Sequence, residues 1–332
     1  MASKIEWTDE TWNPVVGCSI VSPGCTNCYA MKMAGRLEAM GTAPHYNGTT
    51  HKTKAGFVWT GKVAGAPEKT LFQPLSWRRS RRIFVNSMGD LFADGVPRDL
   101  VDQVFATMML TPQHQYQLLT KRAGEMRDYV RDLATPAGLD RLMFTWVWHP
   151  TGRRQLIELL DPFRVSRVLS NVWLGVSVEN QLYAHSRRDF LHDAAELGWN
   201  TFVSYEPALG PVDWSGWEFL KWLICGGESG PDARPMHPDW ARDSRDFCAE
   251  HGILFFFKQW GEWAPGEAFS DRSPVLTGAT FFNDRWSQQT FTPSSLEGMH
   301  CDDEPDVWRG GKKYSGRKLD GVEHNARPEV AA

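Results

Sequence analysis

The sequence predicts an α/β fold, a partial or complete (β/α) barrel of parallel strands followed by an irregular C-terminal extension. Short runs rich in β-branched and aromatic residues recur along the chain, and each ends in polar residues. The six runs are 82–86, 115–119, 171–176, 201–204, 221–225 and 253–257. Helical segments lie between them, and this alternation is typical of parallel strands joined by right-handed crossovers. A seventh strand is expected before Cys18.

Four helices are predicted from apolar spacing and from the residues at their ends. The helix over 97–110 begins at Pro97, which suits a first turn. The helices over 28–40, 185–197 and 238–251 each precede a glycine that suits a C-cap. We assign residues 1–260 to the barrel, with an insertion near 134–168 that has its own helix around 155–160. Residues 261–332 lack clear periodicity and are assigned to the extension.

Composition excludes several classes of protein. The chain has 332 residues, 42% hydrophobic and 23% charged, and its net charge of −4 gives no overall basic character for nucleic acid. The longest purely apolar run, 253–257, is far shorter than the roughly 20 residues of a membrane span. The N-terminus has no apolar core of the kind found in secretory signals. We therefore expect a cytoplasmic protein with no membrane partner.

The six cysteines are unevenly distributed. Cys18, Cys25 and Cys28 form a C-x6-C-x2-C loop, whereas the other three are scattered. This clustering indicates metal ligands in a reducing compartment rather than a disulfide framework. Three thiolates would leave one iron of an iron–sulfur cluster open, whereas a structural zinc site needs a fourth ligand. Reactive thiols are a third alternative. Candidates for a remote zinc ligand are Cys225, His45 and Cys301.

A three-cysteine loop after the first strand of a (β/α) barrel resembles the radical S-adenosylmethionine (SAM) superfamily. The runs TWNPVVGC (11–18) and SPGCTNCYA (22–30) are similar to a narrower group, the phage and bacterial radical-SAM-like proteins with this motif. The loop has three more residues between its first two cysteines than the superfamily's commonest spacing. Matching blocks span nearly the whole chain: 86–92, 119–122, 173–180, 226–230, 256–261 and 311–321.

The resemblance implies a 4Fe-4S cluster held by the three cysteines, with SAM at the open iron. Reductive cleavage of SAM would generate a 5′-deoxyadenosyl radical that abstracts hydrogen from a substrate, so an electron-donor protein is an expected partner. Strand ends supply the candidate SAM contacts. They are Ser87 and Asp90 for the ammonium, Lys121, Arg122 or Lys258 for the carboxylate, and Ser177, Glu179 and Asn180 for the ribose. Gly226 and Gly227 would let the backbone approach adenine or the methionyl group closely, and Glu228 is another acceptor or, alternatively, the start of a substrate site. A loop salt bridge or a helix cap is the alternative for each carboxylate.

Two basic runs, 76–82 and 309–318, interleave cations with aromatic residues. Cations neutralise phosphates and aromatic rings stack on bases, so nucleic acid or a nucleotide is the preferred substrate class. The superfamily also includes a DNA photoproduct lyase. The alternative is two solvated basic segments. The rival function is a non-catalytic zinc or iron–sulfur module that binds nucleic acid, which would not require ionisable residues at the strand ends.

Overall fold

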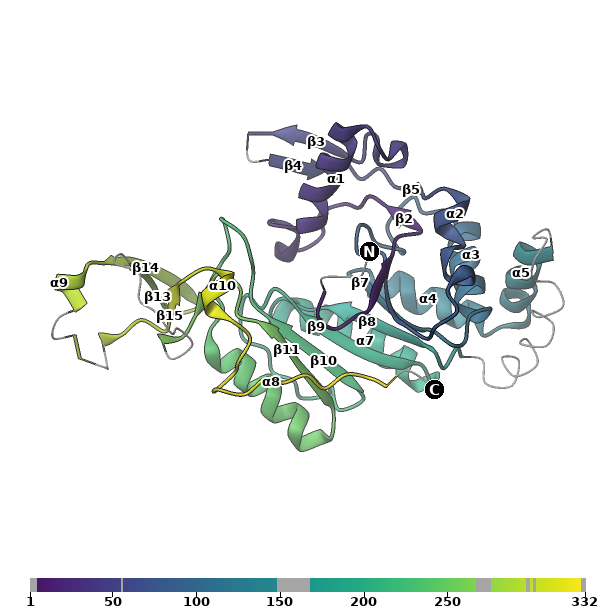
Figure 1. Cartoon of the computed structure of the whole chain (residues 1–332). Helices are drawn as coiled ribbons and strands as arrows, with labels where there is room; N and C mark the ends of the chain where they lie inside the picture. Colours follow the sequence, from purple (N-terminus) through teal and green to yellow (C-terminus); the bar gives the residue numbers. More distant parts are fainter. Residues whose placement is uncertain are drawn as a thin grey trace. The chain divides into compact units, whose positions relative to one another are not determined.

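A seven-stranded sheet is the framework of the fold, and it confirms the predicted partial (β/α) barrel (Figure 1). The strand order is β1-β6-β7-β8-β9-β10-β11. Pairing is parallel from β1 through β8, and again between β10 and β11. All six predicted runs are strands, and β1 is the seventh. The bounds are β1 Glu10–Trp12, β6 Arg82–Val85, β7 Gln115–Thr120, β8 Val172–Ser177, β9 Asn200–Tyr205, β10 Trp222–Gly226 and β11 Leu254–Gln259.

The computed structural model describes residues 5–54, 56–147, 168–266, 276–296, 299–300 and 303–329, without the side chains of 143–147 and 293. The helix predicted around 155–160 and the candidate ligand Cys301 lie outside these residues. None of the helices in the described ranges combines the length and the hydrophobicity needed to cross a bilayer.

Burial explains why the strands read as continuous apolar runs. β8 and β10 are buried at every position. Parallel strands covered on both faces show this pattern, whereas a strand with one wet face would alternate apolar and polar residues.

The four predicted helices are present. They are α1 (Tyr29–Met40), α3 (Arg98–Met109), α7 (Gln181–Glu196) and α8 (Pro238–His251). Gly41 and Gly252 end α1 and α8 in the left-handed conformation, both at φ +66°, as glycine at a C-cap permits. Pro97 is the N-cap of α3 rather than its first helical residue. Two further helices, α4 (Ala123–Leu133) and α5 (Pro136–Val147), follow β7.

Contacts divide the chain into two compact units. Unit 1 comprises Met1–Val176, Arg187–Phe202 and Glu329–Ala332, and unit 2 comprises Ser177–Ser186 and Val203–Pro328. In unit 1, α1 packs on the hairpin of β3 (Thr50–Thr53) and β4 (Gly56–Trp59) (Figure 1). A small apolar cluster there includes Met31, Trp59 and Met88, and Cys18 and Cys28 pack against it. The remaining short elements of unit 1 are β2 (Val15–Val16), β5 (Ala64–Gly65) and α2 (Glu68–Leu71).

In unit 2, α8 packs on β10 and β11 (Figure 1). The segment predicted to be irregular also contains a four-stranded antiparallel sheet in the order β12-β15-β13-β14. The prediction missed it because β14 has the polar sequence RWSQQTF and is mostly exposed, so it carries no apolar run. The elements are β12 (Trp263–Ala264), β13 (Leu276–Phe282), β14 (Arg285–Phe291), α9 (Pro293–Leu296), β15 (Val307–Arg309) and α10 (Lys312–Ser315).

Candidate functional site

The three clustered cysteines occupy one loop of unit 1, between β2 and α1. Gly17 begins the loop at φ +88°, where a side chain would also lie 2.2 Å from the carbonyl oxygen of Lys62. Cys25 ends a 3₁₀ turn over Pro23–Cys25, and Cys28 is the N-cap residue of α1. The turn and the helix start therefore fold the three positions around one short piece of backbone.

The three thiols are free and lie in different surroundings. Cys18 Sγ accepts from Arg122 Nη1 at 3.7 Å, and Ser22 Oγ lies 3.8 Å from Cys25 Sγ. Burial raises the pKa of Cys18 to about 11, with a further contribution from Asp90. Burial also raises the pKa of Cys28, although backbone amides at the start of α1 oppose the shift. Metal binding to these thiols therefore has to displace their protons.

The structure also groups other candidate metal ligands. Among the described residues, His192, Asp193 and Glu196 of α7 place ligand atoms within 4.8 Å of one another, outside the cysteine loop. Of the proposed remote zinc ligands, His45 lies in unit 1 and Cys225 is buried in β10 of unit 2.

Asp90 and Arg122 form a buried ion pair beside the cysteine loop. Arg122 Nη1 lies 3.0 Å from Asp90 Oδ2, and the two side chains are 6% and 7% exposed. Arg122 Nη2 donates to Ser19 Oγ at 2.6 Å, so the guanidinium joins Asp90 to the loop. Burial disfavours the charged guanidinium, but Asp90 and then Cys18 raise the pKa of Arg122 above its ordinary value. Arg122 is therefore a fixed cation next to Cys18.

The carboxylate of Asp90 is fully engaged within the protein. Besides Arg122, it accepts from Thr120 Oγ1 at 2.7 Å, the Phe92 amide at 3.0 Å and the Lys121 amide at 3.2 Å. A carboxylate with four donors is poorly suited to bind the ammonium of a ligand. This geometry fits the salt-bridge alternative for Asp90.

Ser87 also has a partner inside unit 1. Its hydroxyl donates to Asn13 Oδ1 at 3.1 Å. Nearby, Gly89 forms a parallel bridge with Gly17, and a Cβ on Gly89 would lie 3.0 Å from the carbonyl oxygens of both Gly17 and Val15. The loop after β6 therefore packs directly on the backbone that leads into Cys18.

In unit 2, the glycines after β10 allow a close approach to the end of β11. A Cβ on Gly227 would lie 1.9 Å from the carbonyl oxygen of Trp260, and a Cβ on Gly226 would lie 2.9 Å from Glu206 Oε1. Glu228 is buried and receives Arg234 Nε at 2.9 Å and Nη2 at 2.6 Å. Arg234 was not predicted from the sequence, because nothing in the loop after Glu228 marks it as the partner.

Lys258 and Gln259 end β11 next to these glycines. Lys258 Nζ lies 3.0 Å from Glu206 Oε1, so this lysine is already neutralised in unit 2. Gln259 Nε2 donates to Ser229 Oγ at 2.6 Å, while its buried Oε1 has no hydrogen-bond partner among the described residues. An unpartnered buried acceptor is unfavourable unless a ligand or water donates to it. Sequence reasoning missed Gln259, although it belongs to the polar cluster that follows the strand.

The residues proposed for the ribose lie where β8 ends. Ser177 is buried, and Glu179 is 0% exposed. Asn180 Oδ1 accepts from the Tyr183 amide at 3.4 Å at the start of α7, which is the geometry of a helix cap. The three residues therefore adjoin one another, with Asn180 occupied by its own helix.

The candidate residues divide between the two units. Unit 1 contains Cys18, Cys25, Cys28, Ser87, Asp90, Lys121 and Arg122, and unit 2 contains Ser177, Glu179, Asn180, Gly226, Gly227, Glu228 and Lys258. Direct contacts join Cys18, Asp90 and Arg122 in the first unit. In the second, the ends of β10 and β11 bring the glycines beside Lys258.

Comparisons with known proteins give two distant structural matches and one family. A double mutant of spore photoproduct lyase with bound AdoMet and dinucleoside spore photoproduct is 9% identical, with 86% of this chain and 69% of that chain covered at a TM-score of 0.38. Spore photoproduct lyase complexed with dinucleoside spore photoproduct is 10% identical, with 64% and 54% covered at a TM-score of 0.28. No curated protein matches. The model of DUF5131, described as a protein of unknown function, matches residues 2–328, and the chain therefore belongs to the DUF5131 family.

Proposed function

We propose that this protein is an iron–sulfur enzyme of the radical SAM type, in which Cys18, Cys25 and Cys28 hold a 4Fe-4S cluster. The observation that carries the proposal is a single loop that holds three free thiols, with the buried Arg122 donating to the first of them, Cys18. Iron–sulfur clusters are held by cysteine thiolates, and a set of three leaves one iron for another ligand.

The surroundings of the loop suit such a group. Arg122 fixes the first ligand by donating to Cys18 Sγ, and amides at the start of α1 face the sulfur of Cys28. Hydrogen bonds to sulfur and restricted solvent access are the means by which proteins set a cluster's potential. The apolar cluster that includes Met31 and Met88 packs against Cys18 and Cys28 and limits the access of water.

Cys18, Cys25 and Cys28 would hold the cluster, which, once reduced by an external electron donor, would supply one electron for the cleavage of SAM to methionine and a 5′-deoxyadenosyl radical that abstracts hydrogen from the substrate. The protein's own part is to bind and orient SAM. In unit 2 the buried Gln259 Oε1, which has no partner among the described residues, is an acceptor at the end of β11. The close-packed Gly226 and Gly227 keep side chains away from the same strand ends.

Within this proposal, several residues take roles other than those expected from their sequence positions. Asp90 and Arg122 are positioning residues for Cys18, because their charges satisfy each other. Lys258, paired with Glu206, is a weaker candidate for the SAM carboxylate than its sequence position indicated. The SAM contacts of Lys121, Ser177, Glu179 and Glu228 stay predictions.

The test is reductive cleavage of SAM by the anaerobically reconstituted protein. With dithionite as reductant, we expect 5′-deoxyadenosine to accumulate, and we expect Cys18→Ala, Cys25→Ala and Cys28→Ala each to abolish it. Cys248→Ala is the matched control, because Cys248 is a buried thiol outside the loop. Turnover that survives all three loop substitutions would refute the proposed ligands.

A further inference from the structure

We propose that the basic segment 309–318 of unit 2 is a binding surface for single-stranded nucleic acid. This inference names the substrate class of the proposed enzyme, and to that extent it rests on the proposed function. The segment contains five cations and, from residue 307 to residue 319, no acidic residue, in a chain whose net charge is −4. Its cations are Arg309, Lys312, Lys313, Arg317 and Lys318.

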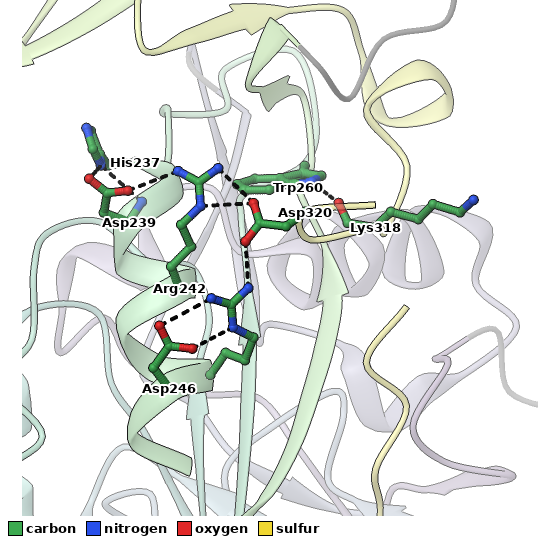
Figure 2. A network of polar contacts seen from close by, with 8 residues as sticks. His237, Asp239, Arg242, Asp246, Trp260, Lys318 and Asp320 are labelled. Atoms are coloured by element: carbon green, nitrogen blue, oxygen red, sulfur yellow. Dashed lines mark hydrogen bonds and ion pairs between the residues drawn. The ribbon is translucent and has the colours of Figure 1, made fainter. Parts of the chain in front are cut away.

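The backbone of this segment is anchored where β11 ends. The amides of Gly310 and Gly311 donate to the carbonyl oxygen of Glu262 at 3.1 and 3.0 Å. The Trp260 amide donates to Gly316 O at 3.2 Å, and Trp260 Nε1 donates to Lys318 O at 2.8 Å (Figure 2). Because Trp260 directly follows β11, the basic segment lies at the carboxyl end of that strand.

Glu262, which holds the backbone of the basic segment, also contacts the loop that follows β10. The Glu262 amide donates to Glu228 O at 3.0 Å, and Glu262 Oε1 accepts from the Gly230 amide at 3.0 Å. In parallel α/β folds, substrates bind where the carboxyl ends of strands meet the following loops. The basic segment therefore adjoins the candidate residues of unit 2 rather than a remote surface.

An ion-pair network fixes the far end of the segment. Asp320 receives Arg242 Nε at 2.9 Å and Nη2 at 2.8 Å (Figure 2). It also pairs with Arg245. Both arginines belong to α8, so Lys318 is held between the Trp260 and Asp320 contacts. A surface held in place before binding loses less conformational entropy when a ligand docks.

The side chains of the segment divide into two groups. Arg317 stacks on Phe256 at 5.2 Å and Arg309 on Trp263 at 5.8 Å, so these two cations pack on unit 2 itself. The other group faces solvent and consists of Lys312, Lys313, Lys318 and Tyr314, with Tyr314 51% exposed. Lys313 Nζ lies 5.7 Å from the Tyr314 ring.

An exposed aromatic ring among lysines fits a single strand better than other anionic partners. The ring offers a stacking face for an unpaired base, while the lysines neutralise the adjoining phosphates. Anionic lipids also attract lysines, but α10 has four residues, Lys312–Ser315, and forms no amphipathic helix that would insert into a bilayer. An acidic protein would pair with the lysines, and competition by polyglutamate distinguishes it from a single strand.

The second basic run, 76–82, provides a matched control, because its aromatic ring, Trp77, is half-buried and lies under Arg81. Arg81 pairs with Glu10 at 2.6 Å and Arg82 pairs with Asp9 at 3.2 Å. Arg82 also begins β6, so this run precedes the amino end of its strand. Arg78 and Arg79 are exposed, and replacing them removes two positive charges without touching segment 309–318.

The experiment measures the affinity of the full chain for a fluorescein-labelled oligothymidylate by anisotropy over a series of salt concentrations. For single strands, log K falls with log salt, and each lost phosphate contact makes this negative slope shallower by about 0.7, so Lys312→Gln/Lys313→Gln makes it shallower by about 1.4. Tyr314→Ala weakens binding by about 5- to 150-fold, as expected for one lost stacking contact, while Tyr314→Phe does not. Arg78→Gln/Arg79→Gln leaves both the affinity and the slope with salt unchanged.

Absence of binding, or equal losses in the Arg78→Gln/Arg79→Gln control, would overturn the inference. Competition by polyglutamate or by phosphatidylserine vesicles as strong as that by unlabelled oligonucleotide would also overturn it in favour of a general acidic partner. The same titration on Cys18→Ala keeps the two proposals distinguishable. If Cys18→Ala binds the oligonucleotide but the wild type does not cleave SAM, only the proposed function is contradicted. If the wild type cleaves SAM but does not bind the oligonucleotide, only this inference is contradicted.

Discussion

Replacement of Arg122 by Met tests whether the buried pair with Asp90 holds unit 1 together beside the cysteine loop. The substitution keeps an apolar stem of similar length but removes the guanidinium that lies 3.0 Å from Asp90 Oδ2. Asp90, at 7% side-chain exposure, then has only neutral donors from Thr120, Phe92 and Lys121.

The size of the effect follows from that burial. Removing one partner of a buried ion pair costs about 3–5 kcal/mol, because the remaining charge is uncompensated. Three surviving hydrogen bonds place the Arg122→Met variant near the lower limit, about 3 kcal/mol. For a unit of this size, that loss lowers the melting temperature by roughly 6–12 °C.

The assay measures the free energy of unfolding of the cluster-free protein, so that metal ligation makes no contribution to the measured stability. A double-mutant cycle with Asp90→Asn provides the control, since the double variant leaves neither charge buried alone. We expect Asp90→Asn/Arg122→Met to be less destabilised than the sum of the single variants by about 1–3 kcal/mol. Additive losses, or a loss under about 1 kcal/mol in Arg122→Met, would refute the assignment of a coupled buried pair.

Three further predictions follow from other parts of the structure. Hydrogen bonds from Arg242 and then Arg245 hold the pKa of Asp320 below its ordinary value. The contribution of Asp320 to the free energy of unfolding is therefore complete above about pH 4 and is lost as the pH falls through the lower folded pKa. Urea unfolding at several pH values should show a weaker dependence on acid in Asp320→Asn than in the wild type. Gly227→Ala places a Cβ 1.9 Å from a backbone oxygen and should yield unstable protein, whereas Gly124→Ala, in the first turn of α4 with its nearest atom at 3.7 Å, should leave the thermal unfolding midpoint unchanged or raise it. Burial raises the pKa of Cys18 to about 11. In the cluster-free protein, the rate of alkylation of Cys18, monitored by peptide mass spectrometry, should therefore rise about tenfold per pH unit between pH 8 and pH 10. A rate that levels off near pH 9 would contradict this.

The barrel could be predicted because its strands are buried over their whole length. β8 and β10 are buried at every position, and such strands leave continuous apolar runs in the sequence. The sheet of β12–β15 could not be found in the same way, because β14 is polar and largely exposed. Its clearest local signal is the pair Asn283 and Asp284, whose positive φ angles make the two-residue turn between β13 and β14.

The cysteine loop could be predicted because its ligands are close in sequence. The partners of the other candidates are not: Asp90 and Arg122 are 32 residues apart, and Glu206 and Lys258 meet only through the ends of their strands. Sequence position identified these residues as charged and close to strand ends, but which charges neutralise each other depends on the folded register. The boundary at residue 260, the electron donor, the cytoplasmic location and the phage association stay predictions.

Metal and sulfide analysis of the anaerobically purified chain tests the central claim most directly. We predict a brown protein with about four irons and four sulfides per chain, retained in Cys248→Ala and lost in Cys25→Ala. A colourless protein with one tightly bound zinc per chain, and no iron after reconstitution, would contradict the account.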